Sequence, residues 1–500
     1  MLETVAKINS AVNNVVWGWP ALILLAFVGI FMTVRTKFFQ ISHFGHWWKQ
    51  TIGAVFHDKD VRGHTKDKSI SQFQSLCTAL AATVGTGNIV GVAGAIMVGG
   101  PGAVFWMWLI AFFGMMTSYA ENVLGIFYRR RNSAGEWSGG AMYYLRDGLG
   151  AKKGCKTLGM VLAVLFSLFC FLASFGIGNM TQINSISGNM STVFGVPTWV
   201  TGAVIVVLAG LVILGGLKRI ASVTEKIVPF MVILYIAGSV VIFCLNISMI
   251  GPVFRAIFTR AFSLEAAAGG AAGTVMKLAI EQGMKRGVFS NEAGLGSSVM
   301  ANSSSNVREP ARQGMWGIFE VFTDTIIVCT LTAFSVLSSG LVDLETGVTQ
   351  AACNGVELTG ANLVGTVFSL HFGFAGAAFV AVSVMLFAFS TCLGWSHYGS
   401  KACEFLFGEK VTKVYQVIFV LATFGGAVMK ENLAWSIADT LNGMMMLPNL
   451  VGVLVLSPVV IKITKNYVDR RLRGKDVPPL LSSFPDIQQE HEKAVCAGEQ

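Results

Sequence analysis

Long apolar stretches recur along this chain and constrain its fold more than any other feature. About eleven of them run for roughly 17–25 residues with few charges, the length that a helix needs to cross a ~30 Å hydrocarbon layer. A helix satisfies its backbone hydrogen bonds internally, which an open strand in lipid cannot do. Apolar residues make up 53% of the chain and charged residues only 13%. The pattern predicts an all-α polytopic membrane protein whose surface faces lipid.

The expected transmembrane helices follow from these stretches. The last stretch is long for one helix and contains Pro448, so it forms either one kinked span or two. With a single crossing there, the chain has about eleven spans, near residues 17–34, 72–98, 102–128, 158–184, 197–217, 227–248, 270–290, 313–337, 363–392, 411–429 and 432–464.

Basic residues predict the orientation of the bundle. With the N-terminus outside and the C-terminus cytoplasmic, 31 of the 36 Lys and Arg residues fall in segments expected inside, among them 285–312. Basic residues favour the cytoplasmic side of a membrane. The stretch 17–34 is followed by no small-residue cleavage site, so we expect it to remain as a leader helix. The net charge of +9 therefore reflects topology and does not indicate nucleic-acid binding.

Two clusters of small and polar residues interrupt apolar spans. The first, Thr83 to Ile89, places two glycines, a threonine and an asparagine near the centre of span 72–98. A helix break there is tolerable only where it lines a cavity or contacts a ligand, and the alternative is a tight helix crossing. The second cluster, Gly283 to Gly296, resembles a broken helix. Its alternative is a helix that ends at Ile280 and continues as a solvated basic loop.

The two breaks lie about 200 residues apart, in spans that cross the membrane in opposite directions. Five spans per half with a broken first helix is typical of an inverted-repeat transporter. We therefore expect a leader helix and cytoplasmic loop at 1–66, a transporter core at 67–465 and a cytoplasmic tail at 466–500. The core comprises a first repeat at about 72–248 and a second at about 265–465.

The ends of broken helices have a defined chemistry. The half-helix that ends near Gly85 presents carbonyl groups suited to a cation, and the half that begins near Asn88 presents N–H groups suited to a carboxylate. Such a break can hold an amino-acid zwitterion beside a sodium ion, and glycine favours a small substrate. Ser390 and Thr391 add two hydroxyls that either join the sodium ligands or bond their own helix.

Other polar groups fall near membrane depth without an assigned role. Glu121, Glu320 and Asp324 are functional candidates because ionisable groups in spans are costly, and a carboxylate that takes up a proton would allow proton coupling. No Walker loop, nucleophile set or metal cluster supports an enzyme or an ATP-driven pump. We expect no organic cofactor, and membrane lipid as a partner with no obligatory protein partner.

Several strings resemble the sodium:alanine (or glycine) symporter family. They are Gly99–Gly100–Pro101–Gly102 with the following residues to Gly114, Gly85–Thr86–Gly87–Asn88, Lys285 to Gly294 and Phe389 to Trp395. The resemblance implies a leucine-transporter-like 5+5 inverted repeat with two broken helices. It also implies that the substrate touches Thr86, Gly87 and Asn88, that Trp395 lines the substrate pocket and that sodium touches Thr391. Position in this fold adds Gln182 and Phe289 to the expected substrate contacts. The helix-end and hydroxyl chemistry described above adds Thr83, Gly85 and Ser390 to the expected sodium ligands.

The resemblance selects the function that helix-end chemistry permits. It implies secondary active import of alanine or glycine, driven by inward Na⁺ flow with alternating access, across a bacterial cytoplasmic (inner) membrane. The alternatives are proton-coupled, exchange or Na⁺-coupled transport of another neutral amino acid, such as glutamine or serine. A receptor without transport is a weaker alternative, because the chain has no long soluble module.

Overall fold

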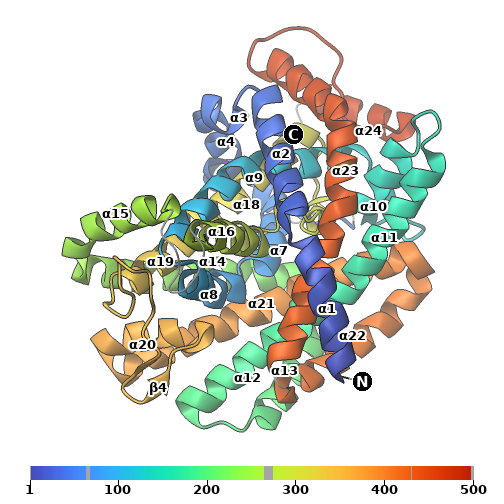
Figure 1. The fold of residues 1–500 in the computed structure, drawn as a ribbon. Helices are drawn as coiled ribbons and strands as arrows, with labels where there is room; N and C mark the ends of the chain where they lie inside the picture. The colour runs from blue at the N-terminus through green and yellow to red at the C-terminus, as the bar shows by residue number, and fades with distance from the viewer. Residues whose placement is uncertain (1, 64–67, 264–273, 430, 497–500) are drawn as a thin grey trace.

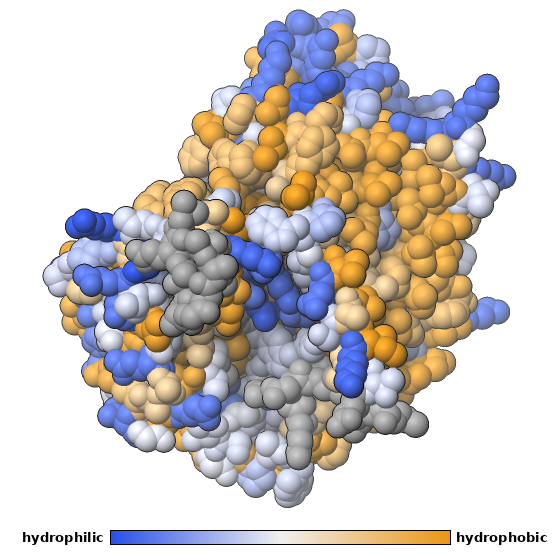
Figure 2. All heavy atoms as spheres, in the orientation of Figure 1, coloured by the Kyte–Doolittle hydropathy of each residue, from blue (hydrophilic) through white to orange (hydrophobic). Residues whose placement is uncertain are grey.

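The computed structural model describes residues 2–63, 68–263, 274–429 and 431–496 and is built almost entirely of helices (Figure 1). Eight of the described helical segments are long and apolar enough to cross a membrane. A ninth span is a bent pair, in which residues 72–83 and 86–99 meet at 57°. Figure 2 shows apolar side chains over a broad middle region of one face, with hydrophilic side chains gathered at its top. The expected fold class of a polytopic helical membrane protein is confirmed.

The first half of the chain contains the leader, the bent pair, three long spans and a shorter apolar helix at Thr198–Ile213. In chain order its elements are α1 (Leu2–Val16), α2 (Trp19–Arg35), α3 (Phe39–Ser42), α4 (Phe44–Trp48), α5 (Ala54–His57), α6 (Lys59–Arg62), α7 (Gln72–Thr83), α8 (Val90–Gly99), α9 (Gly102–Phe127), β1 (Arg130–Arg131), β2 (Trp137–Ser138), α10 (Ala141–Tyr143), α11 (Lys156–Phe175), α12 (Thr181–Phe194), α13 (Thr198–Ile213), α14 (Gly216–Leu245) and α15 (Ile250–Ala261).

The second half begins after 264–273, which include the first residues of the span expected at 270–290 and lie outside the described residues. Its elements are α16 (Thr274–Asn291), α17 (Val299–Asn302), α18 (Pro310–Val321), α19 (Thr330–Leu337), β3 (Ala352–Cys353), β4 (Val356–Glu357), α20 (Gly360–Phe372), α21 (Phe374–Phe407), α22 (Thr412–Val428), α23 (Glu431–Arg471) and α24 (Pro485–Cys496). The strands form two antiparallel hairpins, β1–β2 and β3–β4.

The interrupted helices lie at the centre of the bundle. In Figure 1, α7, α8, α9, α16 and α18 gather in the middle of the view. Helix α9 packs against both α16 and α18, while α2 packs against the outer side of α9 and against α23. Helix α7 begins at a reciprocal cap, in which the Ser71 hydroxyl accepts from the Gln74 amide and the Gln74 side chain accepts from the Ser71 amide, each over 3.2 Å.

Several expected boundaries were wrong, and glycine or proline geometry explains them. The span expected at 363–392 is two helices, α20 and α21, because Gly373 adopts the left-handed φ of 55° between them. The segment 218–226, expected as a loop, belongs to α14, which follows a tight turn at Gly216 (φ 74°). Helix α23 runs through Pro448 and Pro458 without ending, so the described part of the last stretch is one helix.

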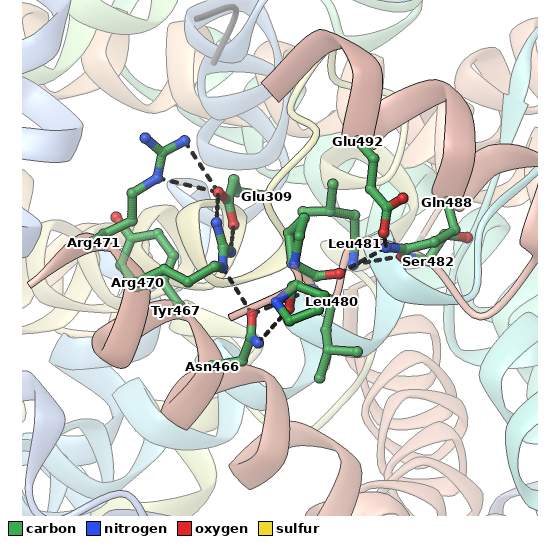
Figure 3. A network of polar contacts seen from close by, with 12 residues as sticks. Glu309, Asn466, Tyr467, Arg470, Arg471, Leu480, Leu481, Ser482, Gln488 and Glu492 are labelled. Atoms are coloured by element: carbon green, nitrogen blue, oxygen red, sulfur yellow. Dashed lines mark hydrogen bonds and ion pairs between the residues drawn. The ribbon is translucent and has the colours of Figure 1, made fainter. Parts of the chain in front are cut away.

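The C-terminal residues pack back onto one end of the bundle, which we call the basic end because Arg129–Arg131 and Arg470–Arg473 lie there. Glu309 accepts from Arg470 over 3.0 and 2.7 Å and from Arg471 over 3.3 and 3.2 Å (Figure 3). Beyond α23, Gln488 donates to the Pro479 carbonyl, and the Ser483 amide donates to the Phe127 carbonyl at the end of α9. The tail thereby connects α23 to α9 and to the segment before α18.

Substitution Glu309→Gln tests the importance of this connection. The Glu309 side chain is only 4% exposed, so the substitution leaves Arg470 and Arg471 beside a buried neutral amide in place of a carboxylate. We expect a local destabilisation of about 2–4 kcal/mol, measured as faster hydrogen–deuterium exchange in 472–496. Glu490→Gln is the matched control, because Glu490 pairs with Arg131 at 56% exposure and should matter little. If both substitutions changed hydrogen–deuterium exchange equally, Glu309 would not be the residue that holds the tail on the bundle.

Candidate functional site

The first break lies between α7 and α8 and is held by a single asparagine. Gly85 is extended (φ −132°, ψ −151°), and Thr86–Asn88 form one 3₁₀ turn. The Asn88 side-chain oxygen accepts from the Gly85 amide over 2.9 Å, and its nitrogen donates to the Asp324 carboxylate over 2.6 Å. Both ends of the Asn88 amide therefore bond protein groups, which fixes the unwound backbone in place.

The second break occupies only the last part of the segment expected to be broken, Gly283 to Gly296. Helix α16 continues through Gly283 and Gly287 to Asn291, so the first part of the expected break is helical, and the alternative of a helix end at Ile280 is wrong. These two glycines instead allow close packing on α9: a Cβ at Gly283 would lie 2.3 Å from the Ala103 carbonyl oxygen. The helix is interrupted at Glu292, Gly294 and Gly296, whose φ angles are 57°, 95° and 75°.

The segment expected as a cytoplasmic loop, 285–312, is also corrected by this geometry. Residues 287–305 are buried inside the protein, and Lys285 and Arg286 belong to α16. Lys285 Nζ lies 2.8 Å and Arg286 Nη1 3.6 Å from the Asp439 carboxylate on α23, near Trp17 at the end opposite the basic end. These two basic residues are therefore paired within the bundle and cannot serve as topology signals.

The last turn of α16, just before the second break, faces the first break. A Cβ on Gly87 would lie 3.3 Å from the Phe289 ring and 3.3 Å from the Ser290 backbone, so α16 approaches the first break through the space that glycine leaves. The Ser290 hydroxyl donates to Asp324 over 2.8 Å, as does the neighbouring Thr325 hydroxyl. Asp324 thus joins the first break, α16 and a π-helical segment at Phe322–Cys329.

Helices α12 and α21 complete the surroundings of the first break. The Thr86 hydroxyl donates to the Gln182 side-chain oxygen over 3.1 Å, while Gln182 donates to the Ile177 carbonyl over 2.9 Å. A π-helical turn at Gly176–Met180 precedes α12, and such turns are frequent at functional sites. On the other side, a Cβ on Gly85 would lie 2.4 Å from the Thr391 hydroxyl. Residues separated by about 300 positions therefore meet at Gly85.

The ten residues expected to bind substrate or sodium are all buried. Seven of them lie in contact around the first break: Gly85, Thr86, Gly87, Asn88, Gln182, Phe289 and Thr391. The Ser390 and Thr391 hydroxyls both donate to the Phe387 carbonyl, over 2.9 and 3.0 Å, and Ser390 also contacts Met231. The Thr83 hydroxyl bonds its own helix at the Ala79 carbonyl over 3.3 Å.

Trp395 lies at the second break. Its indole nitrogen donates to the Glu292 carboxylate over 2.9 Å, and Ser297 donates to the other oxygen over 2.5 Å. The Trp395 side chain fits there because residue 178 is a glycine: a Cβ at Gly178 would lie 2.2 Å from the Trp395 Cβ. Trp395 therefore packs between α12 and the second break, one helical turn from Thr391.

Four buried carboxylates surround the two breaks: Glu121, Glu292, Glu320 and Asp324. Glu121 accepts from Asn449, and Glu320 accepts from Asn302 over 3.0 Å. Among the described residues, none of the four has a Lys or Arg within ion-pair distance. The sequence marked Glu121, Glu320 and Asp324 by their depth, whereas Glu292 and Ser290 appeared only within the expected second break and a family string, without a role of their own.

An aromatic and charged cover lies over the first break on the side of Trp17. The Phe289 and Trp435 rings stack at 6.1 Å with an interplanar angle of 25°. The Arg286 guanidinium lies 5.5 Å from the Phe289 ring centre, and the Trp17 indole donates to the Asp439 carbonyl over 2.8 Å. The unwound backbone is thus enclosed by groups from α16, α23 and the leader.

The donor set fits a hard monovalent cation and a small polar solute. Hydroxyl, carbonyl and carboxylate oxygens converge on the first break, and oxygen ligands suit hard cations. The four buried carboxylates have no Lys or Arg partner in the described part of the chain, so a cation that enters the site would balance their negative charge. No group of His, Cys, Asp and Glu suited to a transition metal occurs among the described residues.

Comparison with known proteins agrees with this geometry. The model of the sodium:alanine symporter family matches residues 2–480. The chain is 44% identical to the sodium/alanine symporter AgcS of Methanococcus maripaludis, over 94% of this chain and 98% of that protein. It is 34% identical to the probable sodium/glutamine symporter GlnT of Bacillus subtilis, over 99% and 97% of the two chains. The resemblance seen in the sequence is confirmed.

A solved structure shares the fold. The Na⁺-coupled sialic acid symporter in its substrate-bound outward-open state matches with a TM-score of 0.51 at 13% identity, over 97% of this chain and 96% of that chain. At this identity the likeness concerns the fold alone, and it confirms the leucine-transporter-like fold class. With a family match across nearly the whole sequence, the chain belongs to the sodium:alanine symporter family and is a membrane transporter, not an enzyme.

Proposed function

We propose that this protein imports alanine, glycine or a closely related neutral amino acid together with Na⁺, by alternating access. The observation that carries the proposal is the meeting of Gly85 and Gly87 with Thr391 and Phe289 at an unwound, buried backbone. Helix ends at this break supply carbonyl groups for a cation and N–H groups for a carboxylate. The close approach of Phe289 to Gly87 leaves little room for a long side chain, which supports a small substrate.

The roles of individual residues follow from this arrangement. Thr86, Gly87, Asn88, Gln182 and Phe289 touch the substrate or fix the backbone that does, and Trp395 supports the pocket from the second break. Sodium takes oxygen ligands from Thr83, Gly85, Ser390 and Thr391. Asp324 supplies a negative charge one hydrogen bond away from the break, through Asn88.

The proposed transport direction requires the orientation given by the basic residues. We place the basic end in the cytoplasm and the Trp17 end outside, in the inner membrane of a bacterium, with a 5+5 inverted repeat. Within this frame, 1–66 is the leader segment, 67–465 is the transporter core and 466–500 is cytoplasmic. Outside access then requires the cover formed by Phe289, Trp435 and Asp439 to open.

Uptake into proteoliposomes tests the function. Labelled alanine, glycine and glutamine are supplied separately under an inward Na⁺ gradient, with K⁺ replacing Na⁺ as control and an imposed pH gradient as a further arm. We expect accumulation of alanine or glycine only with Na⁺. Equal uptake with K⁺ refutes sodium coupling, uptake driven by the pH gradient alone supports the proton-coupled alternative, and glutamine uptake without alanine or glycine uptake refutes the substrate.

Substitution Thr391→Ala tests the sodium ligand. Loss of one hydroxyl ligand should raise the Na⁺ concentration for half-maximal uptake about tenfold, equivalent to ~1.4 kcal/mol. Substrate affinity at saturating Na⁺ should change less, and Thr391→Ser should restore wild-type behaviour. The matched control is Ser400→Ala, which removes a similar buried hydroxyl bonded to its own helix over 2.7 Å. An unchanged Na⁺ dependence in Thr391→Ala would remove this ligand from the proposal.

Substitution Asp439→Asn tests the outer cover. Loss of the charge that pairs with Lys285 should favour opening and increase the reaction of Cys329, which lies beside Asn88 and Ser290, with an externally added impermeant thiol reagent. In a variant that retains only this cysteine, we expect a rate increase of about tenfold. Glu281→Gln is the control, because its pair with Lys277 on α16 is 3.9 Å long and more exposed. Similar rates in the two variants would argue against a cover at Asp439.

A further inference from the structure

A small groove at the basic end lies between the leader and the last turns of α23. Its volume is about 170 Å³. Arg35 and Lys37 line it from the turn that joins α2 to α3, and Lys465 and Arg473 line it from α23 and the residues after it. Two segments more than 400 residues apart in the sequence therefore direct four basic side chains to one cavity. Helices α2 and α23 lie in contact, and both are in front in Figure 1.

The turn between α2 and α3 is held in an unusual conformation. Lys37 and Phe38 are consecutive non-glycine residues with positive φ angles of 59° and 53°. Each such residue costs of order 1–3 kcal/mol unless its surroundings enforce it. Here Phe39 is buried and stacks on His43 at 4.7 Å, which anchors the start of α3 and leaves the Lys37 side chain exposed. The position of this basic group is therefore determined by packing.

Most cations of the groove have no carboxylate partner among the described residues. In the described part of the chain, Arg35, Lys37 and Lys465 form no ion pair, and Arg473 shares the Asp469 carboxylate with Lys475 over 3.0 and 3.2 Å. Burial, and then the positive charge of Arg473, lower the pKa of His43 below its ordinary value. Asp469 pairs with only one of the four cations that line the groove, so the groove carries net positive charge and suits an anion.

The groove also lies beside an apolar surface. Phe38, Ile41, Phe44 and Trp48, on or next to α3 and α4, are 38–57% exposed, and Phe39, Ile461 and Val468 line the cavity itself. The exposed apolar residues follow directly after α2 in the sequence, next to the basic residues Arg35 and Lys37. Basic groups above exposed apolar side chains mark the boundary between lipid headgroups and acyl chains.

We propose that this groove binds the phosphate headgroup of an anionic phospholipid from the cytoplasmic leaflet. Arg35, Lys37, Lys465 and Arg473 hold the phosphate, and the acyl chains lie along the apolar side chains of α3 and α4. Basic pockets between membrane helices on the cytoplasmic side have the chemistry for such headgroups. The bound lipid connects the leader helix to α23, the helix that also carries Asp439 at its other end.

Native mass spectrometry of the full chain in detergent tests this site. The probe is phosphatidylglycerol, compared with phosphatidylcholine, titrated onto the wild type and onto Arg35→Gln/Lys465→Gln. We expect phosphatidylglycerol binding to weaken about thirtyfold in the double variant, since each basic group near a membrane surface is worth ~1 kcal/mol. The matched control is Lys59→Gln/Lys462→Gln, which removes two exposed cations outside the groove and should leave binding within about twofold.

Several outcomes of the lipid titration would overturn the proposal. Equal binding of the two lipids, or equal loss in the control variant, would show a general effect of positive charge. Displacement of phosphatidylglycerol by millimolar inorganic phosphate would show a site for a free anion. Because neither Arg35 nor Lys465 bonds a carboxylate in the described structure, thermal unfolding without added lipid should be unchanged in the double variant. Arg35→Lys/Lys465→Arg should retain binding, so a loss there would also refute the phosphate site.

Discussion

The hydrogen bonds of Asn88 are the interaction on which the central structure depends. An unwound backbone inside a membrane protein exposes polar groups that lipid cannot satisfy. Asn88 accepts from the Gly85 amide and donates to Asp324, which in turn accepts from Ser290 on α16. One side chain thus stabilises the first break and connects it to the helix that contains the second. A similar network at the second break places Glu292 between Trp395 and Ser297.

Glycine makes this network possible by letting neighbouring groups approach. Thr391 lies where a side chain at Gly85 would be, and Trp395 lies where one at Gly178 would be. The unwound segment therefore contacts α21 directly through its backbone. Such contact suits a carrier, because small displacements of α21 or α16 would change the proposed cation ligands and the proposed substrate enclosure at the same time.

Helix α23 connects the two ends of the molecule. Near its start Asp439 pairs with Lys285, in its middle Asn449 bonds Glu121 and the Gly294 carbonyl beside the second break, and near its end Arg470 and Arg471 hold Glu309. It therefore contacts α16, the second break and the segment before α18. A bound lipid at Lys465 and Arg473 would act on the same helix, which gives the membrane a physical connection to the transport core.

The membrane bundle, the first break and the family could be predicted from the amino-acid sequence alone. Apolar length requires helices in lipid, and Gly85, Gly87 and Asn88 lie together near the middle of one span, so local composition was sufficient. The second break could not be located in the same way, because glycine serves both close packing and unwinding. Gly283 and Gly287 pack against α9, whereas Glu292, Gly294 and Gly296 adopt positive φ. The side chains that meet at the two breaks could not be predicted from the sequence. Thr391 reaches Gly85, and Lys285 reaches Asp439, because helices distant in sequence pack together, and spacing along the chain carries no information about such contacts.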